Sequence, residues 1–472
     1  MDEKKKSKKG GFSGQLGFVM AAAGSAVGVG NIWRFPYLAA KDGGGVFLII
    51  YLILVLTFGF TLLTNDIGIG RKTQKSSIQA YDQVKRGWGF LGKITFAVPA
   101  IIMTYYAVIG GWILKYIIVY LTGAGKAAAA DAYFTSFITA PISPVVYGLI
   151  FMLLTIVIVY RGVENGIEKF SKWVMPALFV MILVIAVFSL TLSHKTGNGS
   201  VRTGMQGLGV YLIPNFKGMT FGRFMQILLD AMSQLFFSLS VSMGIMITYG
   251  SYVKKDVDLN RSINLIEIFD TVVAFLAGMM IIPAIYVFSG VKGMAAGPSL
   301  IFVSLPKVFA EMGIAGPIVG GVFFVMVAFA AMTSCISVLE TLVANCMEIF
   351  NASRKKVTLI LGTVYLGMTL IICLGYTVFY FELKLPNGSV GQLLDLADYV
   401  SNSFLMPITS LLSCILIGWV IGPKYVIDEM ELNGEHFRRQ RIYIVMVKYV
   451  APIIMFALFL QSAGILNLLH IQ

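Results

Sequence analysis

The chain has 472 residues, of which 57% are hydrophobic and only 12% are charged. A soluble protein of this length needs far more charged surface, so most side chains must face lipid or other helices. The formal net charge of +13 does not indicate a nucleic-acid partner, because the basic residues gather at the ends of apolar runs, where they set membrane orientation.

Apolar runs long enough to cross a bilayer, each of about 20 residues, recur along the chain. They predict an all-α membrane protein with a single domain (1–472) and roughly eleven spans. Basic segments precede the first run, fill 71–93 and follow the eighth run. We therefore expect a cytoplasmic N-terminal tail (1–11) and, with an odd number of spans, a C-terminus outside. The predicted spans are 12–38, 43–70, 92–121, 145–160, 168–191, 223–252, 262–288, 316–350, 357–375, 395–421 and 443–468.

The first predicted span contains three glycines within residues 24–31, followed by Arg34 and Pro36. Gly24 and Gly28 also match the Gly-x-x-x-Gly pattern of close helix packing, which is the alternative interpretation. Such a stretch makes a poor continuous helix. A broken helix at membrane depth is tolerated where something polar is bound, so we favour a break here.

The sixth predicted span carries three serines that alternate with apolar residues between Gln234 and Gly244. Serines of this kind can also bond to their own helix, so alone the pattern is weak. Paired interruptions in corresponding spans are typical of inverted-repeat transporters. We therefore predict a 5+5 arrangement with repeats at 12–191 and 223–421, and an extra helix at 443–468.

Polar side chains at membrane depth indicate a transport pathway. Asp270 lies in the seventh predicted span, and Thr333 and Ser334 lie in the eighth. The two hydroxyls can alternatively bond to their own helix. The sequence has no phosphate loop and no zinc-protease motif, so we do not expect an enzyme. The four cysteines, expected to be packing residues inside spans, are Cys335, Cys346, Cys373 and Cys414.

The run AGSAVGVGNIWRFPY at 23–37, followed by Gly43-Gly44-Gly45, resembles the neurotransmitter:sodium symporter family, and the chain looks like a bacterial member with the leucine-transporter fold. The resemblance implies a sodium-coupled symporter that imports a neutral, hydrophobic amino acid by alternating access across the plasma (inner) membrane. The oligomeric state stays open between monomer and homodimer. Further matching segments are Tyr105-Tyr106, 234–252, Asp270-Thr271, Thr333-Ser334 and Asp398-Tyr399.

The resemblance also implies two sodium sites built from oxygen ligands, which a hard cation prefers. The first site would use Ala26, Asn31, Ser238 and Asp270, together with the carboxylate of the substrate. The second site would use carbonyls of Gly24, Val27 and Ala330 with the hydroxyls of Thr333 and Ser334.

By the same matching, the amides of Val29 and Gly30 and the Tyr106 hydroxyl would bind the substrate carboxylate, as anions bind at helix N-termini. Carbonyls of Ala26, Phe237 and Ser238 would face its ammonium group. The side-chain pocket carries no charged group, which disfavours a basic or acidic amino acid. It would be lined by Ile102, Phe237, Ser240, Met243 and Val338.

The family closes its outer side with an Arg–Asp pair, here Arg34 and Asp398, capped by Phe237. The inner gate departs from the family pattern, since Lys9 and Phe12 stand where arginine and tryptophan are usual, and lysine lacks the bidentate fork of arginine. The expected inner partners are Ser251, Tyr252 and Glu348.

We expect transport without chloride. Tyr51, Gln234 and Ser238 match three groups of the chloride site of relatives, but Ala274 stands where chloride-dependent members have serine, and Asp270 can balance the sodium charge instead. Two alternatives remain open. One is a proton-coupled amino-acid carrier of the same fold. The other, an ion channel, is disfavoured because channels usually build filters from symmetric copies.

Overall fold

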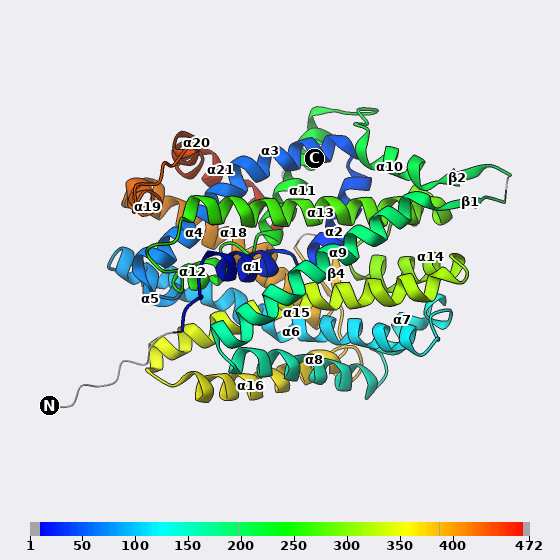
Figure 1. The fold of residues 1–472 in the computed structure, drawn as a ribbon, viewed down its shortest axis with the longest axis horizontal. Coiled ribbons are helices and arrows are strands. Elements are labelled where there is room, and N and C mark those ends of the chain that lie inside the picture. The colour runs from blue at the N-terminus through cyan, green and yellow to red at the C-terminus, as the bar shows by residue number, and fades with distance from the viewer. Residues whose placement is uncertain (1–9, 198, 387, 466–472) are drawn as a thin grey trace.

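The computed structural model describes residues 10–197, 199–386 and 388–465, and Figure 1 shows them as a bundle of long helices. Within these residues, nine helices are long and apolar enough to cross a membrane, or ten if one bent pair counts as a single span. The bent pair is the first predicted span. Together with the broken sixth span, all eleven predicted spans are accounted for. The nine are Gly45–Thr73, Gly89–Leu121, Ser143–Tyr160, Val163–Thr191, Leu259–Ser289, Ala315–Phe350, Arg354–Leu374, Leu393–Val420 and Gln440–Ser462.

The first span is broken as predicted. It consists of α1 (Gln15–Ala26) and α2 (Val29–Lys41), which meet at an angle of 52°. Gly28 between them is extended, with φ −110° and ψ −173°. A Cβ at this position would lie 3.0 Å from the Ser334 hydroxyl, so glycine allows the break to sit against the eighth span.

The sixth span is also broken, into α11 (Phe221–Ser238) and α12 (Ile245–Gly250). Ser240 and Ser242 between them have left-handed φ values of 52° and 61°. This uncommon conformation needs external support. The Ser242 N–H donates to Asp66 Oδ2 at 2.7 Å, and the Thr409 hydroxyl donates to the Ser242 carbonyl at 2.8 Å. Side chains of the second and tenth spans therefore satisfy the unwound backbone.

The unbroken spans surround these two. The third is α6 (Gly89–Leu121), the fourth α8 (Ser143–Tyr160), the seventh α13 (Leu259–Ser289), the eighth α15 (Ala315–Phe350) and the ninth α16 (Arg354–Leu374). Four spans contain short π-helical segments. They are the second (α3 Gly45–Leu54, η1 Val55–Gly59, α4 Phe60–Thr73), the fifth (η3 Val163–Glu168, α9 Lys169–Thr191), the tenth (α17 Leu393–Asp398, η6 Tyr399–Leu405, α18 Met406–Ile415, η7 Leu416–Val420) and the eleventh (α20 Gln440–Val445, η8 Met446–Val450, α21 Ala451–Ser462).

The broken first span occupies the centre of the bundle. α1 packs against α9, α13 and α15, as Figure 1 shows. All its residues from Ala21 to Ala26 are buried, because small side chains let the neighbouring helices approach. The four cysteines are buried and free, as expected for packing residues.

Shorter elements connect the spans. The helices are α5 (Ser77–Val84), η2 (Ala127–Ala129), α7 (Tyr133–Ile138), α10 (Gly204–Leu212), η4 (Val291–Gly293), η5 (Leu300–Ser304), α14 (Leu305–Glu311) and α19 (Lys424–Met430). Two small antiparallel hairpins pair β1 (Ser193–Lys195) with β2 (Val201–Thr203) and β3 (Leu383–Lys384) with β4 (Val390–Gly391). Most of the predicted tail (1–11) lies outside the described residues, and so does the end of the predicted span 443–468.

Candidate functional site

A small cavity of about 30 Å³ lies between the two helix breaks. It gathers every predicted substrate residue except Val29 and adds three positions that the sequence reasoning missed. Those three are Ser25, Gly28 and Ile245, and none of them carries a charge. The only sequence signal that could have identified them is their position beside the helix breaks. The lining residues are Ser25, Ala26, Gly28, Gly30, Asn31, Ile102, Tyr106, Phe237, Ser238, Ser240, Met243, Ile245, Ser334 and Val338.

The cavity has a polar end and an apolar end. At the polar end, Val29 and Gly30 open α2, so their amides lack partners within the helix, and the Val29 amide lies within hydrogen-bonding reach of the Tyr106 hydroxyl. At the other end lie Ile102, Met243 and Val338. The arrangement suits a small molecule with a carboxylate and an uncharged side chain.

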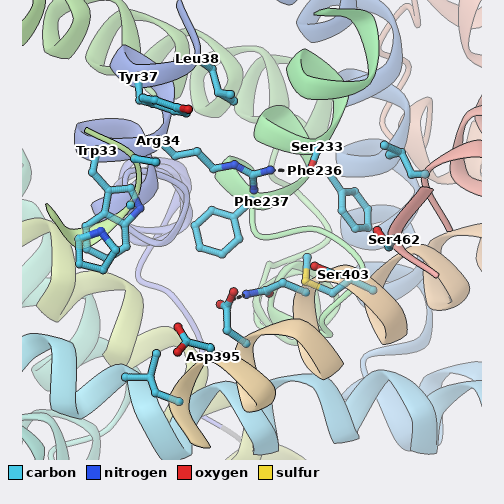
Figure 2. Close-up of a pocket in the computed structure, with 18 of the residues that line it drawn as sticks. Trp33, Arg34, Tyr37, Leu38, Ser233, Phe236, Phe237, Asp395, Ser403 and Ser462 are labelled. Carbon is cyan, nitrogen blue, oxygen red and sulfur yellow. Dashed lines mark hydrogen bonds between the residues drawn. The ribbon is translucent and has the colours of Figure 1, made fainter. Parts of the chain in front are cut away.

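Phe237 separates this cavity from a larger outer vestibule of about 440 Å³, because its side chain lines both. A Cβ at Gly30 would lie 2.6 Å from the ring, so the aromatic group rests directly on the backbone of α2. Figure 2 shows the ring beneath the Arg34 side chain. Phe237 therefore lies between the cavity and the vestibule.

The expected direct pair between Arg34 and Asp398 is not formed. Arg34 Nη2 donates to the Ser233 hydroxyl at 2.7 Å, as Figure 2 shows. Asp398 Oδ1 accepts from Tyr105 at 2.8 Å and from Asn402 at 2.7 Å. Both charged groups line the vestibule. Because the vestibule keeps them apart, each takes a neutral polar partner instead.

The residues of the first predicted sodium site form one buried cluster. Asp270 Oδ1 accepts from Asn31 Nδ2 at 2.8 Å and from the Ser238 hydroxyl at 2.7 Å. Its second oxygen, Oδ2, is buried and has no hydrogen-bond partner among the described residues, and the same holds for Gln234 Oε1. An unpaired buried carboxylate oxygen is costly, so the donor set fits a small hard cation. The Ala26 carbonyl, at the end of α1, is free of the helix ladder.

The second predicted sodium site lies where the end of α1 meets α15. The Thr333 hydroxyl donates to the Ala330 carbonyl at 3.0 Å, and the Ser334 hydroxyl donates to the Ser25 carbonyl at 3.1 Å. A Cβ on Gly24 would lie 3.3 Å from Thr333, so these two residues are in contact distance. Val27 follows as the C-cap of α1. The described residues contain no cluster of three His, Cys, Asp or Glu side chains able to hold a metal. The hydroxyl and carbonyl oxygens here suit an alkali cation better than a transition metal.

The predicted inner-gate residues lie at the opposite end of α1 from the break. Phe12 is buried among the rings of Phe18, Tyr249 and Tyr252, at centroid distances of 5.6, 5.5 and 6.1 Å. Ser251 donates to the Thr248 carbonyl at 2.6 Å. Lys9 lies outside the described residues.

Glu348 forms a hydrogen bond to the start of α5, a helix that was not expected to take part in the inner gate. Its Oε2 accepts from the Ser76 N–H at 3.0 Å, which ties the end of α15 to α5. Tyr252 donates to Glu340 Oε1 at 2.5 Å, and Glu340 in turn forms a bidentate pair with Arg354. The sequence reasoning missed Glu340 and Arg354, although a glutamate inside an apolar run is a signal.

Glu168 is another residue that the sequence reasoning missed, near the start of α1. One carboxylate oxygen accepts from the Ser13 N–H at 2.8 Å, and the other accepts from the Ser13 hydroxyl and from Lys172 Nζ, the latter at 2.6 Å. A Cβ at Gly17 would lie 2.2 Å from this carboxyl group, so α1 approaches it closely. Glu168 thus joins the start of the first span to the fifth.

Comparison with known proteins shows matches over nearly the whole chain. The profile described as "Sodium:neurotransmitter symporter family" matches residues 9–135 and 141–471. The "Uncharacterized sodium-dependent transporter YhdH" of Bacillus subtilis (strain 168) is 33% identical over 463 residues, which cover 97% of this chain and 98% of that protein.

A more distant relative and a solved structure point to the same family. The human "Sodium- and chloride-dependent GABA transporter 2" is 23% identical, covering 90% of this chain and 75% of that protein. The crystal structure of MhsT in complex with L-phenylalanine matches with a TM-score of 0.82 at 33% identity, covering 96% of this chain and 100% of that one. The similarity therefore includes both helix breaks and the helices that support them.

Proposed function

Since the chain belongs to the sodium:neurotransmitter symporter family, we propose that it imports a neutral, hydrophobic amino acid together with sodium by alternating access. Sodium-coupled symport follows from the family; the substrate class is our inference. The observation that carries it is the cavity between the two breaks, with helix amides at one end and uncharged side chains at the other. MhsT, whose solved complex contains L-phenylalanine, supports this class.

The substrate carboxylate is proposed to bind the Val29 and Gly30 amides and the Tyr106 hydroxyl. Its ammonium group faces the Ala26, Phe237 and Ser238 carbonyls, and its side chain lies among Ile102, Ser240, Met243 and Val338. A basic or acidic side chain placed among these residues would be buried without a partner, which is costly. Selection against charged amino acids thus arises from desolvation rather than from steric exclusion.

Two sodium ions are proposed. One binds at Ala26, Asn31, Ser238 and Asp270, where a buried carboxylate oxygen lacks a partner. The other binds at Gly24, Val27, Ala330, Thr333 and Ser334. Both sites touch the break in α1–α2, so sodium binding stabilises the broken conformation to which the substrate binds.

Chloride is not required in this proposal. Ala274 is buried in α13 one turn after Asp270, and its methyl group offers no donor to an anion. The Tyr51 hydroxyl lies beside Ser238 and Asp270. Asp270 therefore supplies within the protein the negative charge that an anion would otherwise bring.

The gates and the topology belong to the same proposal. Phe237, Arg34 and Asp398 close the outer side, and Lys9, Phe12, Ser251, Tyr252 and Glu348 close the inner side. The transporter lies in the plasma (inner) membrane with its N-terminus in the cytoplasm and its C-terminus outside. The domain division is supported by the position of the broken pairs, each of which opens a set of five spans.

The test uses purified protein in liposomes with an inward sodium gradient and a panel of labelled amino acids. Saturable uptake of neutral hydrophobic amino acids, absent when potassium replaces sodium, is the expected result. Uptake driven equally well by a proton gradient alone would identify a proton-coupled carrier. Conductance without saturation would identify a channel. Preference for lysine or glutamate would contradict the cavity assignment.

A further inference from the structure

A hollow of about 760 Å³ opens beside α5, away from the candidate transport site. Its walls come from three places in the chain: the segment before and within α5, the turn before α6 together with the start of α6, and the end of α15. Figure 1 places α5 at one end of the molecule, beside α4 and α12. The lining residues used below are Lys75, Gln79, Lys93, Phe90 and Ile349.

The hollow and its rim are basic. Lys75 and Lys93 line it, and the adjacent turn adds the exposed Lys85 and Arg86. In the part of the chain that the structure describes, none of these four cations has an ion-pair partner. Asp82 is the one acidic residue that lines the hollow. The excess positive charge calls for an anionic ligand.

An apolar rim adjoins these cations. Phe90 is 47% exposed, Ile349 is 44% exposed and Phe350 is 71% exposed. Trp88 packs against Phe90 at a ring-centroid distance of 5.6 Å. Aromatic side chains next to lysines at a span end are typical of the headgroup level of a membrane. A ligand that contacts both the cations and the apolar rim must be an amphiphile.

We propose that an anionic phospholipid of the leaflet on the N-terminal side docks here. Its phosphate lies against Lys75 and Lys93, with Gln79 as an additional hydrogen-bond donor. Its acyl chains lie along Phe90 and Ile349. Lys85 and Arg86 add attraction to the anionic surface around it.

The site is connected to the inner gate through α5, and this consequence rests on the proposed function. The Ile78 N–H donates to Asn345 Oδ1 at 2.9 Å, and Gln79 Nε2 donates to the Glu348 carbonyl at 3.1 Å. Lys75 directly precedes Ser76, which donates to Glu348. A lipid bound at Lys75 and Gln79 therefore stabilises the arrangement in which Glu348 holds α5.

The experiment measures lipid binding to the full-length protein in detergent micelles by native mass spectrometry, without sodium and without amino acid. The three ligands are dioleoyl phosphatidylglycerol, dioleoyl phosphatidylcholine and soluble glycerol 1-phosphate. Phosphatidylglycerol is expected to bind preferentially. The double variant Lys75→Gln/Lys93→Gln is expected to weaken this binding by about fivefold for each lysine removed.

The matched control is Lys169→Gln/Lys356→Gln, which removes two exposed cations that do not line the hollow. It should leave binding unchanged. Three outcomes would overturn the proposal: equal binding of phosphatidylcholine, equal binding of glycerol phosphate, or the same loss in the control as in the double variant. Because neither sodium nor substrate is present, each of these outcomes leaves the proposed transport function untouched.

Discussion

The carboxylate of Asp66 in the second span accepts a hydrogen bond from the backbone N–H of Ser242, at 2.7 Å, within the break of the sixth span. Asp66 is 2% exposed. The carboxylate thus occupies the place that a helical carbonyl would take in a continuous span. It supports the unwound segment that lines the cavity between the two helix breaks.

We predict that Asp66→Ala destabilises the sixth-span break, because it leaves the Ser242 N–H buried without an acceptor, at a cost of about 1–3 kcal/mol. The measurement is the thermal unfolding midpoint together with the apparent affinity for substrate. Asp66→Asn keeps an acceptor oxygen and should therefore lose much less thermal stability and substrate affinity. Equal losses of stability and affinity in the two variants would show that the hydrogen bond to Ser242 does not stabilise the break.

Thr333→Val combined with Ser334→Ala is predicted to abolish sodium-dependent uptake while folded protein remains in the membrane. The substitutions remove two hydroxyl oxygens opposite the Gly24–Val27 carbonyls and keep the side-chain volume nearly constant. Thr341→Val is the matched control, since Thr341 is also buried in α15 and bonds to its own helix through the Ser337 carbonyl at 2.8 Å. Undiminished uptake by the double variant would refute the second sodium site.

Arg34→Glu is predicted to reduce transport at least tenfold, because it places two acidic groups, at positions 34 and 398, on opposite sides of the closing vestibule. Their electrostatic interaction in a partly wet cavity is modest, about 1–4 kcal/mol. Arg34→Lys retains the charge and should preserve part of the activity. Uptake by Arg34→Glu at the unmodified level would show that Arg34 and Asp398 do not act as a gate.

The half of the fifth span that contains Gly166 is predicted to loosen when sodium leaves the proposed second site. Gly166 lies in the π-helical segment η3 and Pro176 lies within α9, and both residues weaken the regular helix ladder. Amide exchange at 167–172 should therefore be faster without sodium. Exchange that is insensitive to sodium would contradict this.

Glu168→Ala should loosen the start of the first span, because the Ser13 N–H loses its acceptor and Lys172 loses its partner. The expected result is faster amide exchange at 15–22, equivalent to about 1–3 kcal/mol of lost local stability. Glu164→Ala is the matched control, since Glu164 lies one turn earlier in the same segment but is exposed. The same increase in both variants would exclude a specific role of Glu168.

Uptake by the unmodified protein is predicted to persist when gluconate replaces chloride. Asp270→Asn removes the fixed negative charge and should lower sodium affinity at least tenfold, or make uptake depend on chloride. Ala274→Ser alone should leave uptake chloride-independent, because Asp270 still balances the sodium charge. Collapse of uptake in the unmodified protein without chloride would refute the assignment.

The sequence alone determined the helical membrane architecture and both interruptions. Span length follows from bilayer thickness, and glycines or alternating serines inside an apolar run weaken a helix wherever it is packed. The break at Gly28 could be predicted from its own short stretch of chain. The unwound Ser240–Ser242 segment could be predicted only together with its position in the sixth span, the counterpart of the first.

Only the tertiary structure decided which polar groups meet. Asp66 with Ser242, Glu168 with Ser13 and Glu340 with Arg354 are each set by helix packing rather than by local pattern. The same reason applies to Arg34 and Asp398, which do not pair directly in this structure and whose role as a gate stays a prediction. Two residues can occupy the right ends of the right helices while the distance between them depends on how far the vestibule is open, and that is a property of the whole bundle.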